Sequence, residues 1–103
     1  MATTKSNFLR TAADELSLVV QVWKEGPTYV AYAPELDVSS CGRTASQAKS
    51  HLREAISLFV EELARRGTLE DILLEAGFEK HGTRFKPRRI LARERLRLTL
   101  PAA

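Results

Sequence analysis

The sequence predicts an α+β fold, in which an antiparallel β-sheet carries one long helix packed on one face. Three observations favour it. Two segments near the N-terminus alternate in hydropathy at period two and are separated by a Gly-Pro turn. A long segment after them repeats apolar residues at helical spacing. The length of 103 residues suits a single domain.

The first predicted strand is Glu15–Lys24. Its apolar face holds Leu16, Leu18, Val20 and Val22, and its mixed face holds Ser17, Val19, Gln21 and Trp23. Gly26-Pro27 predicts a turn, after which Thr28–Ala33 is rich in Tyr and Val and forms the return strand. Pro34 ends that strand because it cannot donate to a ladder. Val38–Cys41 is predicted as a short third strand.

The helix signal is the clearest in the chain. Thr44 and Gln47 have the spacing of a capping box, which satisfies free N–H groups at a helix start. The predicted buried stripe then consists of Ala45, Ala48, Leu52, Ala55, Ile56, Phe59 and Leu63. Arg65 and Arg66 suit the last turn, and Gly67 suits the left-handed position after it.

A second, shorter helix is expected to start at Thr68, which repeats the capping pattern with Asp71, and to stop at Gly77. Residues 78–87 are predicted as a polar, basic loop, and Arg88–Leu100 as a last strand with leucines on one face and arginines on the other. The predicted order is therefore β-β-β-α-α-β. We expect residues 1–13 to form a flexible arm and residues 14–103 to form one domain with a basic C-terminal strand.

Charge divides the chain unevenly. The total is +3, but residues 1–78 hold 8 basic and 11 acidic side chains, whereas residues 79–103 hold 8 basic and 2 acidic ones. The single Cys excludes an internal disulfide framework and suits a reducing compartment. No apolar stretch has the length of a signal peptide or a membrane span. These features predict a cytoplasmic protein that does not engage membranes.

The segment Tyr29–Asp37 (YVAYAPELD), followed by Ser40–Thr44 (SCGRT) and a helix with Gln47-Ala48 and Glu54-Ala55-Ile56, resembles the HicB-like antitoxin family. The likeness covers roughly Leu16 to Arg66. It implies a truncated RNase H-like fold of order β-β-β-α-β, without nuclease activity, that pairs with a small RNA-cleaving toxin of HicA type. Many family members add a C-terminal DNA-binding module. This chain departs there, because a loop and a strand are predicted after Gly77.

No catalytic residue, metal ligand or cofactor site is predicted, and the protein is not expected to be an enzyme. Two-metal nuclease chemistry needs converging carboxylates. Glu35 and Asp37 lie close together but at the corner after the second strand, where a corner hydrogen bond is expected from Asp37. Glu54 lies on the helix side without an evident partner, and the first strand has no internal acid. A degenerate metal nuclease remains a third, minor alternative. Cys41, His51 and His81 lack metal-ligand spacing. We expect His51 to bond to the backbone and Cys41 to pack as a small hydrophobe.

The one unusual surface is basic. It consists of Arg84, Lys86, Arg88, Arg89, Arg93, Arg95 and Arg97. Such residues contact nucleic-acid phosphates or an acidic partner protein. Equally, they can lie across the acidic helix of their own or a neighbouring subunit. With Phe85 as the only aromatic among them, base stacking has little support.

A homo-oligomer is predicted from the sheet face that the helix leaves bare. Val19 and Trp23 occupy it, beside either Tyr29 or Tyr32, and such aromatic residues are enriched at contacts between chains. The candidate interface is Val19, Trp23, Leu96, Leu98 and Leu100. The leading hypothesis is thus a non-catalytic, HicB-like interaction protein that oligomerises and neutralises a toxin. The alternative is a regulator that binds nucleic acid through its basic C-terminal segment.

Overall fold

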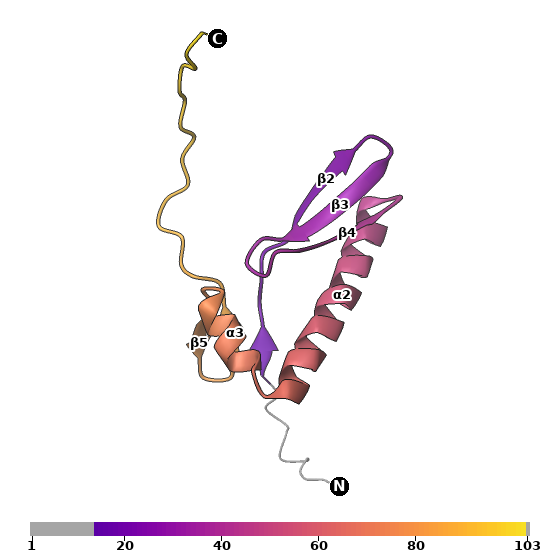
Figure 1. Ribbon diagram of the computed structural model, residues 1–103, viewed down its shortest axis with the longest axis vertical. Coiled ribbons are helices and arrows are strands. Elements are labelled where there is room, and N and C mark those ends of the chain that lie inside the picture. The colour runs from indigo at the N-terminus through magenta and orange to yellow at the C-terminus, as the bar shows by residue number, and fades with distance from the viewer. Residues whose placement is uncertain (1–13, 103) are drawn as a thin grey trace, which may run out of the picture.

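The computed structural model describes residues 14–102, and the predicted arm, residues 1–13, lies outside them. The α+β prediction is confirmed: within residues 14–102, two three-stranded sheets accompany two helices, the longer of which packs on strands (Figure 1). The elements are β1 (Glu15–Leu16), β2 (Gln21–Glu25), β3 (Thr28–Ala33), β4 (Val38–Gly42), α2 (Ala45–Arg66), α3 (Leu69–Glu75), β5 (Glu79–His81) and β6 (Arg84–Lys86).

The larger sheet has the antiparallel order β2-β3-β4. Its hairpin turn lies at Gly26, whose φ of 58° is in the left-handed region that glycine adopts without strain. Alternation along β3 gives the sheet its two sides, because Ala31 and Ala33 are fully buried beneath α2 while Val30 and Tyr32 point to the opposite face. Both predicted strands, Thr28–Ala33 and Val38–Cys41, are confirmed.

Helix α2 begins and ends as the sequence predicts. The Thr44 hydroxyl accepts a hydrogen bond from the Gln47 N–H at 3.0 Å. The Gln47 side chain in turn accepts from the Arg43 N–H at 2.6 Å, one residue earlier than in a standard capping box. At the other end, Gly67 has φ 74° and donates to the carbonyls of the last turn.

Two small cores stabilise the fold. The first joins Ala31, Ala33, Ala48 and Leu52, and the second joins Leu73, Phe78 and Phe85. Leu18 packs against both clusters. The segment between β1 and β2 therefore ties the long helix and its sheet to the smaller unit formed by α3, β5 and β6.

The second sheet has the order β1-β6-β5. β1 pairs with β6 in parallel, with Leu16 opposite Phe85, and the Ser17 N–H donates to the Phe85 carbonyl at 2.8 Å. The β5–β6 hairpin occupies residues that were predicted as a loop, so that prediction was wrong. Phe85 explains the difference, since its burial at 4% exposure gives these short strands an apolar anchor.

The prediction of one strand from Glu15 to Lys24 was also wrong. Residues 17–20 belong to neither ladder and separate β1 from β2. Of the expected apolar face, Leu16 and Leu18 are partly buried, whereas Val20 and Val22 remain exposed. The reason is the position of α2, which packs chiefly against β3 and β4 and leaves the underside of β2 uncovered.

The predicted strand Arg88–Leu100 is absent, because residues 87–102 contain neither helix nor strand. We call residues 88–102 the C-terminal tail. It leaves the body beside α3 as an isolated extended segment and passes beyond the β2–β3 turn at its end, which lengthens the molecule along its 66 Å long axis (Figure 1). Alternating leucines and arginines make a strand only where a neighbouring strand supplies hydrogen bonds. Pro87 has no N–H to continue the β1–β6 ladder, so the tail departs from it.

The short helix was predicted correctly, but not its cap. α3 ends before Gly77, whose φ is 99°. The Thr68 side chain does not cap the helix and instead donates to the Leu63 carbonyl at 3.5 Å. Leu73, on the inner side of α3, is buried in the second core.

Candidate interaction surfaces

The face of the larger sheet turned away from α2 is the first candidate. We call it the open face, and its side chains come from alternate positions of three strands: Gln21, Trp23, Val30, Tyr32, Ser39 and Cys41. Trp23 and Tyr32 meet edge to face, with ring centroids 6.1 Å apart. Tyr32, not Tyr29, is therefore the neighbour of Trp23, because Tyr29 packs against the core under α2. An aromatic pair in which Trp23 is exposed and Tyr32 half-buried, beside the half-buried Val30, gives this face the composition of a protein contact surface.

A polar corner borders the open face. The Tyr32 hydroxyl donates to Asp37 Oδ1 at 2.8 Å, and this hydrogen bond, together with the negative charge of the carboxylate, raises the pKa of Tyr32 above 10.0. Asp37 has φ 56°, a left-handed conformation in which Asp is enriched. The corner hydrogen bond that the sequence suggested for Asp37 is thus present, and it fixes an aromatic side chain of the open face.

The remaining candidate ligands are dispersed. Among residues 14–102, no three His, Cys, Asp or Glu side chains come together in a way that could hold a metal ion. His51 Nδ1 donates to the Cys41 carbonyl at 2.8 Å, which is the backbone contact that we expected. The Cys41 side chain is exposed on the open face and does not pack as a buried hydrophobe. Glu35 carries one buried carboxylate oxygen, Oε1, that has no hydrogen-bond partner in the described part of the chain.

The basic residues fall into two groups. Arg84 Nε lies 3.5 Å from Glu15 Oε1, which makes an ion pair between β6 and β1. Lys86, also on β6, is exposed. Arg88 donates to the Ala76 carbonyl at 3.5 Å and lies against Gly77. The others, Arg89, Arg93, Arg95 and Arg97, lie along the tail and are exposed. Within residues 14–102 none of these four forms an ion pair, so the tail arginines do not lie against acidic side chains of their own subunit.

The predicted oligomer residues are all exposed, but they do not form one patch. Trp23 lies on β2, an edge strand of the larger sheet, and Val19 lies in the segment just before it. Leu96, Leu98 and Leu100 lie on the tail, where their exposed fractions of 74–81% are extreme for leucine. A second copy of the chain could bring the two groups together.

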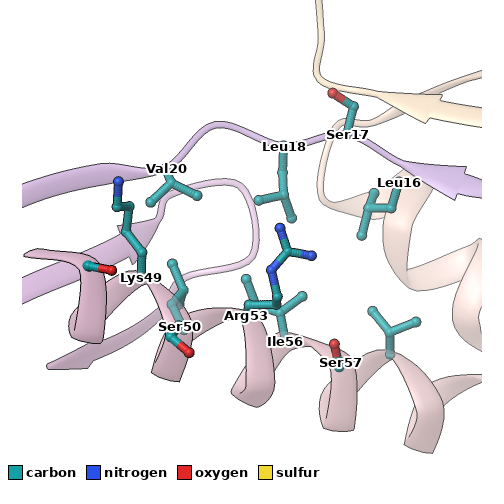
Figure 2. Close-up of a pocket in the computed structure, with 12 residues that line it drawn as sticks. Leu16, Ser17, Leu18, Val20, Lys49, Ser50, Arg53, Ile56 and Ser57 are labelled. Carbon is teal, nitrogen blue, oxygen red and sulfur yellow. The ribbon is translucent and has the colours of Figure 1, made fainter. Parts of the chain in front are cut away.

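Sequence reasoning missed a groove. It has a volume of about 800 Å³ and lies between α2 and the segment that leads into β2. In Figure 2, Leu18 and Val20 point from this segment toward α2, and Lys49 and Arg53 reach back from the helix. The helix pattern does place Lys49 and Arg53 beside the buried stripe, where they line this groove. No sequence rule, however, indicates that α2 packs away from β2 and leaves the groove open.

Comparison with known proteins finds no matching family model, no similar curated protein and no similar solved structure. The resemblance to HicB-like antitoxins therefore stays a prediction. No helix within residues 14–102 is long and apolar enough to span a bilayer.

Proposed function

We propose that this chain is a non-catalytic interaction protein of the HicB-like antitoxin type. In this proposal it self-associates and binds a small, basic, RNA-cleaving toxin of HicA type. Its mode of action is steric, since the partner's active surface is covered by complementary protein surface and no bond is made or broken. It uses no cofactor and acts in the cytoplasm.

The order of the elements supports the family assignment. The resemblance implies β-β-β-α-β. The chain has a three-strand antiparallel sheet, a long capped helix and, after α3 and β5, a strand, β6, that pairs in parallel with β1 in a second sheet. The motif residues occupy structural roles within this order. Asp37 fixes the corner through Tyr32, and Thr44 caps the helix.

The observation that carries the proposal is the open face. It presents Trp23, Val30 and Tyr32 on a rigid sheet whose other side is held by α2. Trp23 is exposed, and Val30 and Tyr32 are half-buried. Aromatic and aliphatic groups gathered at a protein surface mark contact sites between proteins. Residues 14–78 carry six basic and eleven acidic side chains, a net charge of −5, which favours approach of a basic partner.

Co-expression tests the proposal. The chain is produced with each small basic protein encoded beside it, and complex formation and growth rescue are measured. We expect one neighbour to be toxic alone and to be captured and neutralised by this chain. Val30→Glu should abolish capture, because it places a charge at the centre of the open face, whereas Leu58→Glu, at an exposed position of α2, should not. Absence of capture and rescue with every neighbour, or equal capture by both variants, refutes the proposal.

Nucleic-acid binding is a second candidate, favoured by the exposed tail. Arg93, Arg95 and Arg97 recur at every second position and extend into solvent. Binding through such contacts should weaken steeply with salt. Replacing all three by Glu should abolish it. If neither duplex nor single-stranded nucleic acid binds at low salt, this candidate is excluded.

A further inference from the structure

We propose that the C-terminal tail of one copy adds as an antiparallel strand to the free edge of β2 in a second copy, and that two copies exchange tails reciprocally. This inference deepens the self-association in the proposed function and rests on it. It assigns that self-association to two defined segments: residues 93–100 of one chain and residues 18–25 of the other.

The receiving edge is open. β2 is the outer strand of its sheet, all five of its residues are exposed, and nothing in residues 14–102 pairs with its outer side. β4, at the opposite edge, lies along α2. Ahead of β2 in the chain, β1 is paired with β6 as far as Ser17, whose N–H donates to the Phe85 carbonyl. The free edge of β2 thus runs from Gln21 to Glu25, and residues 18–20, which lead into it, are also unpaired within residues 14–102. Such an edge is a template for another strand.

The incoming segment has the two-sided pattern of a strand without having a neighbour. Glu94, Leu96, Leu98 and Leu100 share one side, and Arg93, Arg95, Arg97 and Thr99 share the other. A strand added at the edge of β2 would turn one side toward the groove beside α2 and the other toward the open face. Both environments exist along the edge of β2, because its even-numbered residues face α2 and its odd-numbered residues face away.

One antiparallel register matches the two segments at almost every position. It places Leu100 opposite Leu18, Leu98 opposite Val20 and Leu96 opposite Val22. These leucines then close the groove in which Figure 2 shows Leu18 and Val20 pointing toward α2. The apolar surface that α2 leaves uncovered beneath β2 is thereby removed from water.

The charges match in the same register. Glu94 lies opposite Lys24, with Lys49 on the same side of the sheet at the groove. On the other side, Arg93 lies opposite Glu25 and Arg95 opposite Trp23, which offers its ring to the guanidinium. A shift of two residues in one direction sets Leu96 opposite Lys24. The opposite shift sets Glu94 opposite Val22 and Leu100 opposite Leu16, which already pairs with Phe85 of β6.

The donor has to be a second copy. β6 lies beside β1 in parallel, so the chain's own tail would first run the length of the edge and then reverse. The seven residues from Lys86 to Arg93 reach at most about 25 Å. Extended chain from Ser17 to Glu25 spans about 26 Å. No residues remain for a turn. The Arg88 side chain also directs the start of the tail toward Ala76. Reciprocal exchange between two copies closes the assembly with two-fold symmetry.

Sedimentation of the full chain tests the inference. We expect a dimer of two 11.5 kDa chains. Leu98→Ser should raise the dimer Kd on the order of a hundredfold, since each dimer loses two buried leucines. Leu91→Ser is the matched control, because Leu91 is equally exposed in the tail at 87% but lies outside the paired segment. Glu94→Lys should weaken the dimer several-fold, and adding Lys24→Glu to it should restore the affinity.

Cross-linking distinguishes the donor. In a Cys41→Ser background, Val20→Cys combined with Leu98→Cys should form a disulfide that joins two chains, whereas Val20→Cys with Leu91→Cys should not. A bridge within one chain, Leu98→Ser behaving like Leu91→Ser, or no rescue by Lys24→Glu overturns tail exchange. A dimer that persists in Leu98→Ser leaves self-association standing, whereas a monomeric full chain refutes both. Toxin capture is measured separately and is independent of these results.

Discussion

Leu52→Ala tests whether α2 is seated on the larger sheet as described. Leu52 is 1% exposed and is the one large side chain in a cluster otherwise built from Ala31, Ala33 and Ala48. Its three buried neighbours are methyl-sized and two of them sit on a strand, so they cannot move inward to fill the space that the truncation leaves. Leu18, Tyr29, Val38 and Ile56 pack around this cluster but are only partly buried. The substitution therefore removes the largest fully buried side chain from the contact between α2 and β3.

Truncation of a buried leucine to alanine costs about 2–5 kcal/mol, and poor collapse of the cavity places this site toward the upper end. A chain of this size has a total stability of about 5–15 kcal/mol. With about 4–8 °C lost per kcal/mol in a domain of this length, the melting temperature should fall by at least about 10 °C.

Urea denaturation, followed by circular dichroism and by Trp23 fluorescence, measures the loss in the free energy of unfolding. Leu58→Ala is the matched control, since Leu58 lies on the same helix but is 64% exposed, and it should change stability by no more than about 0.5 kcal/mol. If Leu52→Ala costs less than about 1 kcal/mol, or no more than Leu58→Ala, then α2 is not packed on β3 through this residue.

Three further outcomes follow from the contacts. Thr44→Ala should cost about 1 kcal/mol in chemical denaturation because it removes the cap of α2, and an unchanged midpoint contradicts that role. Gly42→Ala should destabilise more than Gly67→Ala, since a Cβ at Gly42 would lie 2.8 Å from the Ala48 nitrogen whereas at Gly67 only the left-handed backbone resists. Spectrophotometric titration should place the Tyr32 pKa above 10.0 and return it toward that value in Asp37→Asn. Because the folded-state pKa is raised, the stability that this pair contributes is full below pH 10.0 and is lost as pH rises through the higher folded value; identical titrations of both proteins disprove the link.

Local patterns predicted the central elements because local interactions form them. Thr44, the apolar stripe and Gly67 specify the start, the buried side and the end of α2 through contacts within a few residues. Period-two alternation likewise specified β3. The open face was expected as well, although only the register showed that Tyr32, and not Tyr29, accompanies Trp23.

Local patterns failed to predict the structure of the tail and of the first strand. Leu96, Leu98 and Leu100 alternate as strongly as any strand in the chain, yet the segment is solvated. Conversely, the short strand β6 forms among basic residues because Phe85 reaches the second core. Alternating hydropathy predicts which residues of a strand would share a face, but it does not predict whether a neighbouring strand is present to pair with it.

By itself, the sequence determined the α+β class, the limits of α2, the hairpin and the division into an acidic body and a basic end. Each of these depends on residues close together in the chain. Only the tertiary structure decided that β1 pairs with β6, that α2 leaves one side of β2 uncovered and that the tail lacks a partner. Strand pairing and helix placement depend on contacts between distant residues, and their geometry is set by packing rather than by local preference.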